Sequence, residues 1–336
     1  MAKEYQWPTI GNEKIVEFLE RGLKNNKIAQ TYIFAGQNDL GKSTIALALA
    51  RNLQSAADGS ADAESGVAGL NSDLHILQPE ADQKSINIEQ VREFIKTLNL
   101  SSFLNSYKIG IIKEADKLSD EAKSALLKTL EEPKEKVIVI LLVADENNLP
   151  ATILSRGQIL YFQPVPAAVI YDYLIKNYGA SRSLAKDLAN LALGRPLAAV
   201  RLLQNPEAYR AYLERAESWL ASLTRDTNGR LQALNQFFND KTWSKQAVES
   251  AADILNMAEG LARDLLLLNL GHQDRLQFSV LAPALQKTLA SLAAAGDEQN
   301  AALAILKQLK LIAQAREYLA ANVNPRLVLE QIMINL

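Results

Sequence analysis

The first half of the chain alternates short apolar runs with segments in which apolar residues recur every three or four positions. A short apolar run bounded by turn residues predicts a buried strand, and the longer period predicts an amphipathic helix. Strands are predicted at Tyr32–Ala35, Leu74–Leu77, Ile109–Ile112, Val137–Val143 and Gln158–Phe162. Helices are predicted at Asn12–Asn25, Lys42–Gln54, Ile88–Leu98 and Asp120–Leu130. This alternation predicts an α/β domain whose largely parallel sheet is covered on both faces.

After Pro164 and Pro166 the strand pattern stops and only helical periodicity remains. Short helices are predicted at Ala167–Tyr178, Ser181–Leu193 and Leu197–Leu203, and longer ones at Ala247–Leu268, Phe278–Leu292 and Ala301–Leu319. We therefore expect an α/β domain over residues 1–163, a small helical lid over 164–206 and an all-helical domain over 207–336. Such a helical tail is more typical of an assembly module than of a catalytic one.

Composition and charge narrow the function classes only a little. The 336 residues are 48% hydrophobic and 22% charged with a net charge of −2, which is ordinary for a globular protein and gives no global footprint of a nucleic-acid binder. The chain has no cysteine, which excludes disulfides, thiolate nucleophiles and cysteine zinc sites. His75 and His272 are too far apart to indicate a metal centre. With no apolar run of membrane-span length and no signal-peptide core at the start, the expected compartment is the cytoplasm.

The segment Gln54–Asp73 interrupts the α/β pattern. It is rich in alanine, serine, glycine and aspartate, a composition that buries little apolar surface. We expect a flexible insertion there.

The segment Thr31–Leu53 carries a complete GxxxxGK[ST] motif between a predicted strand and a predicted helix. The glycines, Gly36 and Gly41, let backbone N–H groups turn toward a phosphate, and the helix N-terminus adds its positive dipole end. Lys42 is expected to reach the β- and γ-phosphates, and the Ser43 hydroxyl to bind Mg²⁺. The motif and the following Thr44 therefore predict a site for ATP or ADP with Mg²⁺.

A substitution at the end of the strand Ile109–Ile112 argues against hydrolysis at that site. A working site needs an aspartate there to hold Mg²⁺ and then a glutamate to orient water. This chain has Lys113, whose ammonium repels a cation, followed by Glu114. Asp116 lies beyond the predicted strand, which argues against it as the substitute. Glu114 is therefore interpreted as a vestige of the catalytic pair.

Four segments resemble the bacterial clamp-loader family of AAA+ subunits. The helix Ser119–Pro133, SDEAKSALLKTLEEP, is similar to that family's "NALLKTLEEP" signature, and Val139–Gln158 is similar to its "LLPTI" and "SRC" motifs. The opening QWPTIGNEKIVEFLERGLKNNKIAQTYIFAG resembles its N-terminal box, and Ala321–Leu336 its closing collar helix. The resemblance implies an AAA+ P-loop domain with a parallel sheet, a small helical lid and a C-terminal helical collar.

The departures from the family pattern indicate a member that does not hydrolyse ATP. The gamma/tau members, which do hydrolyse it, need the aspartate that Lys113 replaces and an arginine in the lid. Alignment on Gly194 puts Leu197 at the position of that arginine. Most members also carry four cysteines within the region of Gln54–Asp73, and this chain has none there. No zinc is therefore expected.

Arg156 in the motif Ser155–Arg156–Gly157 is the residue most expected to act in catalysis. In the family this arginine enters the nucleotide site of the neighbouring subunit, and a planar, permanently charged guanidinium can bind phosphate oxygens bidentately. Gly157 stands where the family usually has cysteine. The resemblance implies a DNA polymerase III holoenzyme subunit without catalysis of its own, in a hetero-pentamer with gamma/tau and delta subunits. It implies contact with the sliding clamp and primer–template DNA through that complex.

Two other interpretations stay open at this point. The first is a gamma/tau-like ATPase in which Glu114 or Asp116 has taken over Mg²⁺ binding. The second is a stand-alone ATP-binding switch or DNA-repair adaptor on the same scaffold, against which the collar-like C-terminus argues.

Overall fold

The computed structural model describes residues 5–8, 10–58, 73–80, 83, 85–100, 107–238, 243–294 and 298–336. The chain divides into two compact units. The first contains residues 1–170 and 194–198, and the second contains 171–193 and 199–336. The predicted division into three domains is not the same as this partition by contacts, and it stays a prediction.

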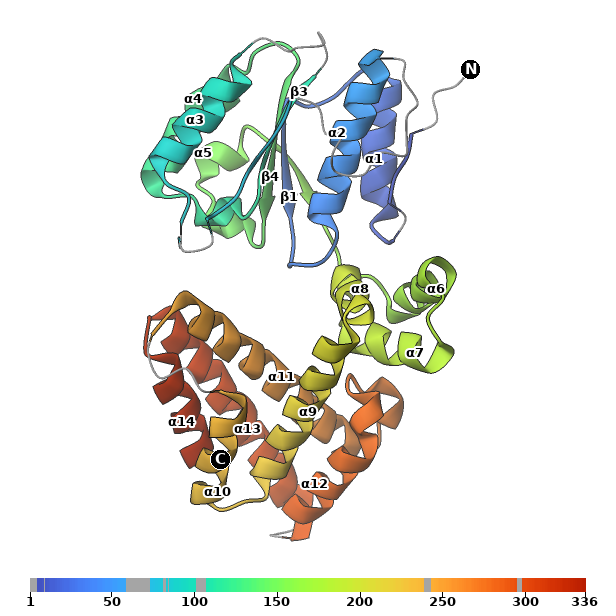
Figure 1. Ribbon diagram of the computed structural model, residues 1–336, viewed down its shortest axis with the longest axis vertical. Helices are drawn as coiled ribbons and strands as arrows, with labels where there is room; N and C mark the ends of the chain where they lie inside the picture. Colours follow the sequence, from blue (N-terminus) through green and yellow to red (C-terminus); the bar gives the residue numbers. More distant parts are fainter. Residues whose placement is uncertain are drawn as a thin grey trace. The chain divides into compact units, whose positions relative to one another are not determined.

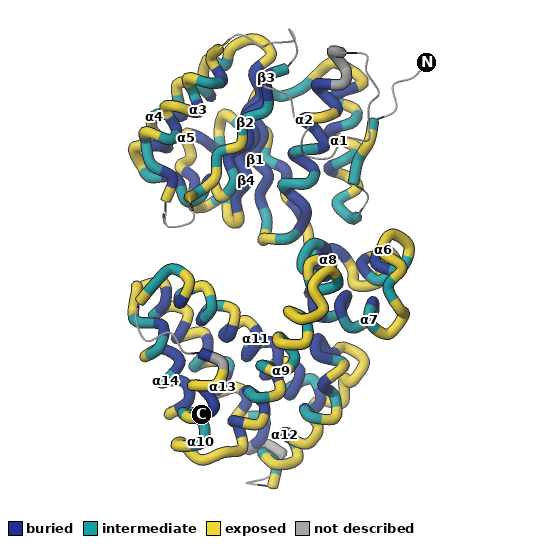
Figure 2. The backbone as a smooth tube through the Cα atoms, viewed as in Figure 1, coloured by how far each residue is buried: buried dark blue, intermediate teal, exposed yellow. Residues whose placement is uncertain are grey.

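The first unit is built on a parallel five-stranded sheet. Its strands are β1 (Thr31–Ala35), β2 (Leu74–Leu77), β3 (Lys108–Ile112), β4 (Val137–Val143) and β5 (Gln158–Tyr161). Their order across the sheet is β2-β3-β4-β1-β5, and every pair is parallel. The three central strands are buried along their whole length, as their unbroken apolar runs predict (Figure 2).

Helices cover both faces of this sheet (Figure 1). One face carries α1 (Glu13–Lys24) and α2 (Lys42–Asp58), and the other carries α3 (Ile88–Leu98), α4 (Asp120–Glu131) and α5 (Ala151–Leu154). Each face has its own cluster of buried apolar side chains. The predicted strands and helices of this half are confirmed, and the α/β fold class with them. Helix α2 runs four residues past the predicted end at Gln54, and residues 59–72 of the predicted insertion lie outside the described residues.

The rest of the chain is helical, as its periodicity predicts. The helices are α6 (Ala167–Tyr178), α7 (Arg182–Leu191), α8 (Pro196–Gln204), α9 (Pro206–Leu223), α10 (Thr227–Phe237), α11 (Lys245–Asn269), α12 (Ala282–Ala294), α13 (Glu298–Ala320) and α14 (Pro325–Asn335). In the second unit α11 packs against α9, α12, α13 and α14. One apolar cluster joins these helices, and Trp219 is its largest fully buried side chain.

Asp264 is a fully buried carboxylate on α11. It accepts hydrogen bonds from the backbone N–H of Gln277 at 3.0 Å and of Phe278 at 2.7 Å. Burial raises the pKa of Asp264 above its ordinary value of 3.8, and the two backbone donors oppose the shift. The carboxylate thus fixes the loop between α11 and the 3₁₀ helix η5 (Ser279–Leu281).

A pH dependence of stability follows from this raised pKa. Because the folded state binds the Asp264 proton more tightly than the unfolded state does, the stability contribution is present below the unfolded pKa and is lost as pH rises through the folded pKa. We expect the unfolding free energy of the wild type to fall, relative to that of Asp264→Asn, as pH rises above 3.8. Urea unfolding at a series of pH values measures this difference, and a constant difference would contradict the prediction.

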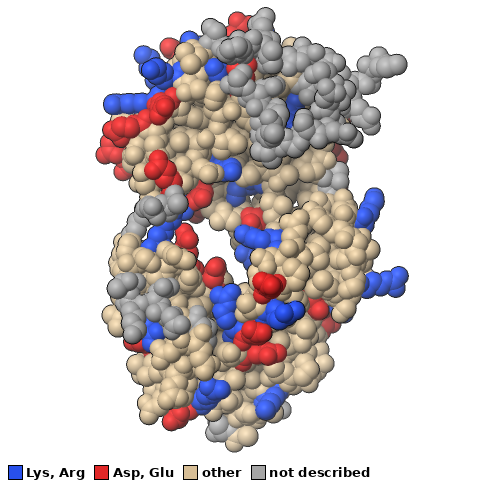
Figure 3. Space-filling model, viewed as in Figure 1, with Lys and Arg blue, Asp and Glu red and all other residues tan. Residues whose placement is uncertain are grey.

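Charged side chains of both signs lie on the face of the described residues that Figure 3 draws. On the face drawn in Figure 3, acidic and basic side chains are interspersed over the molecule. Among the described helices, none combines the length and the apolar character needed to cross a bilayer.

Candidate nucleotide site and interface arginine

The phosphate loop joins the C-terminal end of β1 to the first turn of α2. Gly36 has a φ of +144°, and a Cβ there would lie 2.7 Å from the carbonyl oxygen of Phe162, so the position requires glycine. Gly41 has a φ of +92°, and a Cβ there would meet no heavy atom within 4 Å. Because the first N–H groups of a helix lack partners within it, Ser43 and Thr44 in the first turn of α2 present donors to an anion.

The Lys42 side chain lies along this loop. It is buried, and its ammonium donates to the carbonyl oxygen of Gly36 and, at 2.8 Å, to that of Gln37. Burial lowers the pKa of Lys42, and the negative charges of Asp116 and Asp39 oppose that shift. The structure therefore brings the predicted glycines, lysine and hydroxyl residues to one loop, with two carboxylates acting on the ammonium.

Lys113 and Glu114 follow β3, as predicted. The Lys113 backbone N–H donates to the carbonyl oxygen of Leu77 at 2.8 Å, and its ammonium donates to Oε1 of Gln78 at 3.2 Å. Glu114 has a left-handed φ of +53°, and its carboxylate forms an ion pair with Lys117. The glutamate thus contacts a lysine on its own turn.

Asp116 is one of the two acidic residues whose charges act on Lys42. The left-handed Glu114 is followed at once by the 3₁₀ helix η2 (Ala115–Lys117), which carries Asp116. Its Oδ1 is buried and has no hydrogen-bond partner among the described residues. The sequence left Asp116 open as an alternative Mg²⁺ ligand but argued against it, because the residue lies beyond the predicted strand.

The residues present fit a nucleotide with Mg²⁺ in part. The loop and Lys42 suit phosphates, and the Ser43 hydroxyl and the orphaned Asp116 oxygen are hard oxygen ligands of the kind that Mg²⁺ prefers. Lys113 is the misfit, because it puts an ammonium at the end of the strand where a metal-binding aspartate is needed.

Leu197, at the position of the lid arginine, contacts the phosphate loop through its backbone. Its N–H donates to the carbonyl oxygen of Asp39 at 3.1 Å. Gly194 has a φ of +80°, and a Cβ there would lie 2.6 Å from Cβ of Pro164. The glycine thus lets this segment of the first unit pack closely against Pro164, and a leucine rather than a cation lies next to the loop.

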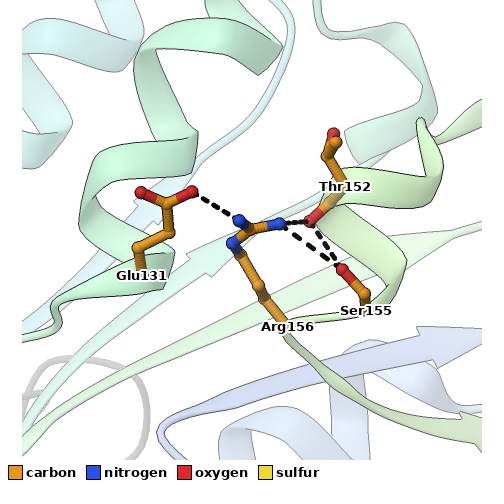
Figure 4. A network of polar contacts seen from close by, with 4 residues as sticks. All are labelled: Glu131, Thr152, Ser155 and Arg156. Carbon is orange, nitrogen blue, oxygen red and sulfur yellow. Dashed lines mark hydrogen bonds and ion pairs between the residues drawn. The ribbon is translucent and has the colours of Figure 1, made fainter.

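Arg156 lies between α5 and β5, and its guanidinium is held by three residues (Figure 4). It donates to Oε1 of Glu131 at 2.5 Å, to the carbonyl oxygen of Thr152 at 2.5 Å and to Oγ of Ser155 at 3.4 Å. The Arg156 side chain is 32% exposed. A Cβ at Gly157 would lie 2.8 Å from the Ile33 side chain of β1. The glycine therefore avoids a clash with β1.

Arg156 lies at the N-terminal end of the parallel strands, and the phosphate loop lies at their C-terminal end. Strands β1 and β5 are parallel, with Tyr32 beside Gln158 and Ala35 beside Tyr161. Arg156 precedes β5, whereas the loop follows β1. The five residues of β1 therefore separate these two ends of the sheet, a span of about 16 Å at 3.3 Å per residue.

Comparison with known proteins shows which proteins the chain resembles. The family described as "DNA polymerase III, delta subunit" matches residues 11–166. The DNA polymerase III delta-prime subunit of Bacillus subtilis is 26% identical over 332 residues, which cover 96% of this chain and 95% of that protein. The chain is thus similar to DNA polymerase III delta-prime subunits.

The chain is also similar to gamma-type subunits. A DNA polymerase III gamma/tau subunit of Mycoplasma genitalium is 30% identical over 49% of this chain, which spans 28% of that relative. A solved gamma-subunit-related protein from Thermotoga maritima covers 94% of this chain and 97% of its own, with 19% identity and a TM-score of 0.47. The similarity to the Bacillus subtilis delta-prime subunit extends over nearly the full length of both chains.

Proposed function

We propose that this chain is a clamp-loader subunit that does not hydrolyse ATP itself and supplies Arg156 to the nucleotide site of a neighbouring gamma/tau subunit. The observation that carries the proposal is that Arg156 lies at the N-terminal end of the strands, whereas the phosphate loop lies at their C-terminal end. Because about 16 Å of strand separates Arg156 from the phosphate loop of its own chain, we infer that the arginine acts at the nucleotide site of another subunit. Its planar fork suits charge that develops on a transferring phosphoryl group.

The chain's own nucleotide site supports binding rather than turnover. The loop offers Gly36, Gly41, Lys42, Ser43 and Thr44 to the phosphates of ATP or ADP. Bound Mg²⁺ would supply charge neutralisation at those phosphates. The lysine after β3 and the leucine in the lid replace two charged groups that hydrolysis needs. In this proposal nucleotide binding stabilises the first unit and zinc has no part.

The helical region over residues 207–336 is proposed to be the collar that joins this chain to gamma/tau and delta subunits in a pentamer. The α9–α14 helices share one apolar core, which gives a rigid body for such a role. Contact with the sliding clamp and primer–template DNA is proposed to occur through the complex.

The proposal is tested by Mg²⁺-dependent ATP hydrolysis of the purified chain, with Lys42→Ala as the control. We expect the same background rate from both proteins, because Lys113 removes the metal-binding carboxylate from the end of β3. Turnover that Lys42→Ala abolishes would instead identify the chain as a motor subunit.

One observation favours the alternative of a gamma/tau-like ATPase. The buried, unpartnered Oδ1 of Asp116 and the action of its charge on Lys42 put a carboxylate near the phosphate loop. In that alternative Glu114 or Asp116 binds Mg²⁺ in place of the missing aspartate, and the ion pair of Glu114 with Lys117 favours Asp116.

Replacing Asp116 tests whether its carboxylate binds Mg²⁺. We expect Asp116→Asn to lower the gain in ATP affinity that Mg²⁺ provides by about tenfold, because an amide is a weaker cation ligand than a carboxylate. Titration with a fluorescent ATP analogue, in Mg²⁺ and in EDTA, measures the gain. Glu114→Gln is the matched control and should leave it unchanged. If Asp116→Asn leaves the gain intact, its carboxylate does not bind the metal.

A further inference from the structure

The ion pair between Arg156 and Glu131 joins two helices that cover the same face of the sheet. Glu131 is the last residue of α4, and Thr152, which accepts the second hydrogen bond, lies on α5. Helices α4 and α5 pack together, and Leu130 and Ile153 are buried in one apolar cluster. The two acceptors are therefore fixed relative to one another by the core beneath them.

The position of Glu131 has an electrostatic cost that Arg156 offsets. A carboxylate in the last turn of a helix lies at the negative end of the helix dipole. Glu132 follows it directly and adds like charge. A glutamate at this place gains from a cation beside it, and the guanidinium is 2.5 Å away.

The contacts still leave Arg156 donors for a phosphate. A guanidinium has five N–H groups, and the bonds to Glu131, Thr152 and Ser155 use three of them in the described structure. A side chain that is already oriented loses less conformational entropy when it binds. An arginine held on rigid acceptors is more accurately placed than one free in solvent.

We propose that Glu131 is a positioning residue for Arg156, and that it orients the guanidinium for engagement with the neighbouring subunit's nucleotide. This inference rests on the proposed function, because it assumes that Arg156 acts in trans. Glu131 itself contacts the arginine and not the nucleotide. Its effect therefore passes entirely through Arg156.

The test is steady-state ATP hydrolysis on clamp and primed DNA by the complex reconstituted with delta subunits and with gamma/tau subunits whose own "SRC" arginines are replaced, so that only the site facing this chain is active. We expect Glu131→Ala to lower kcat about tenfold with KM for ATP unchanged, less than the ~10²-fold cost of a 1 Å misplacement. Glu131→Gln keeps an oxygen acceptor and should retain most of the rate. Glu132→Ala, the adjacent exposed carboxylate, is the control and should match the wild type.

The double variant Glu131→Ala/Arg156→Ala distinguishes positioning from a structural role. We expect it to be no slower than Arg156→Ala alone, and we expect the melting temperature of Glu131→Ala to be unchanged, since the pair is partly exposed. Additive losses, or a Glu131→Ala complex as fast as the wild type or faster, would overturn the inference while Arg156→Ala remains slow. If Arg156→Ala itself is not slow, the proposed function fails and the inference with it.

Discussion

Replacing Arg156 with alanine is expected to slow ATP hydrolysis about 10³-fold at the one nucleotide site that this arginine serves. In the proposed role the guanidinium neutralises charge that grows on the phosphoryl oxygens, and alanine would leave that charge without a partner. Arg156→Lys should recover little, because an ammonium lacks the planar fork. The loss appears in kcat, since the interaction forms in the transition state.

The measurement requires that one site alone be active. We would use gamma/tau subunits whose own "SRC" arginines are replaced, so that the remaining turnover comes from the site that faces this chain. Arg92→Ala is a matched control, because Arg92 is exposed on α3 of the same unit. The prediction fails if the Arg156→Ala complex, shown by size-exclusion chromatography to assemble, turns over at the wild-type rate.

Trp219→Ala is expected to destabilise the second unit by about 3–5 kcal/mol. Trp219 is fully buried on α9, at the centre of the apolar cluster that joins α9 to the helices after it. Removing an indole leaves a cavity that the surrounding helices can only partly fill. The first unit has separate apolar clusters and should keep its stability.

Urea unfolding followed by circular dichroism measures this effect. A chain with two compact units need not unfold in one step, so each transition is fitted separately. Leu270→Ala is the control, because Leu270 is in the same unit and 61% exposed. Equal shifts in Trp219→Ala and Leu270→Ala would show that the cluster around the tryptophan does not hold the unit together.

Hydrophobic periodicity was sufficient to predict most of this fold. The run Val137–Val143 has the same bounds in the sequence prediction and in β4, because a fully buried parallel strand has no polar positions. The end of α2 was predicted less well. The residues after Gln54 are Ser-Ala-Ala-Asp, which carry no apolar period but have no helix breaker either, so the helix continues to Asp58.

Some features of the candidate site could likewise be predicted from the sequence, whereas others depend on tertiary packing. The phosphate loop and the lysine after β3 are visible in the sequence, because their spacing is fixed by one strand and one turn. The burial of the Asp116 carboxylate oxygen and the action of its charge on Lys42 could not be predicted from the sequence, because they depend on how the turn after β3 packs. The contact of Arg156 with Glu131 joins residues 25 positions apart, and only the packing of α4 on α5 brings them together. The roles proposed for these residues stay predictions.

The bond from the Leu197 N–H to the Asp39 carbonyl is made by the main chain alone. Any residue except proline can make it, so it does not depend on whether position 197 carries an arginine or a leucine. Gly36 is likewise constrained by a backbone oxygen, that of Phe162, and Lys42 donates to two backbone carbonyls. Backbone contacts therefore fix the loop within the first unit. Selection for that shape would preserve the motif in a lineage that had lost the reaction, so an intact phosphate loop is poor evidence of turnover.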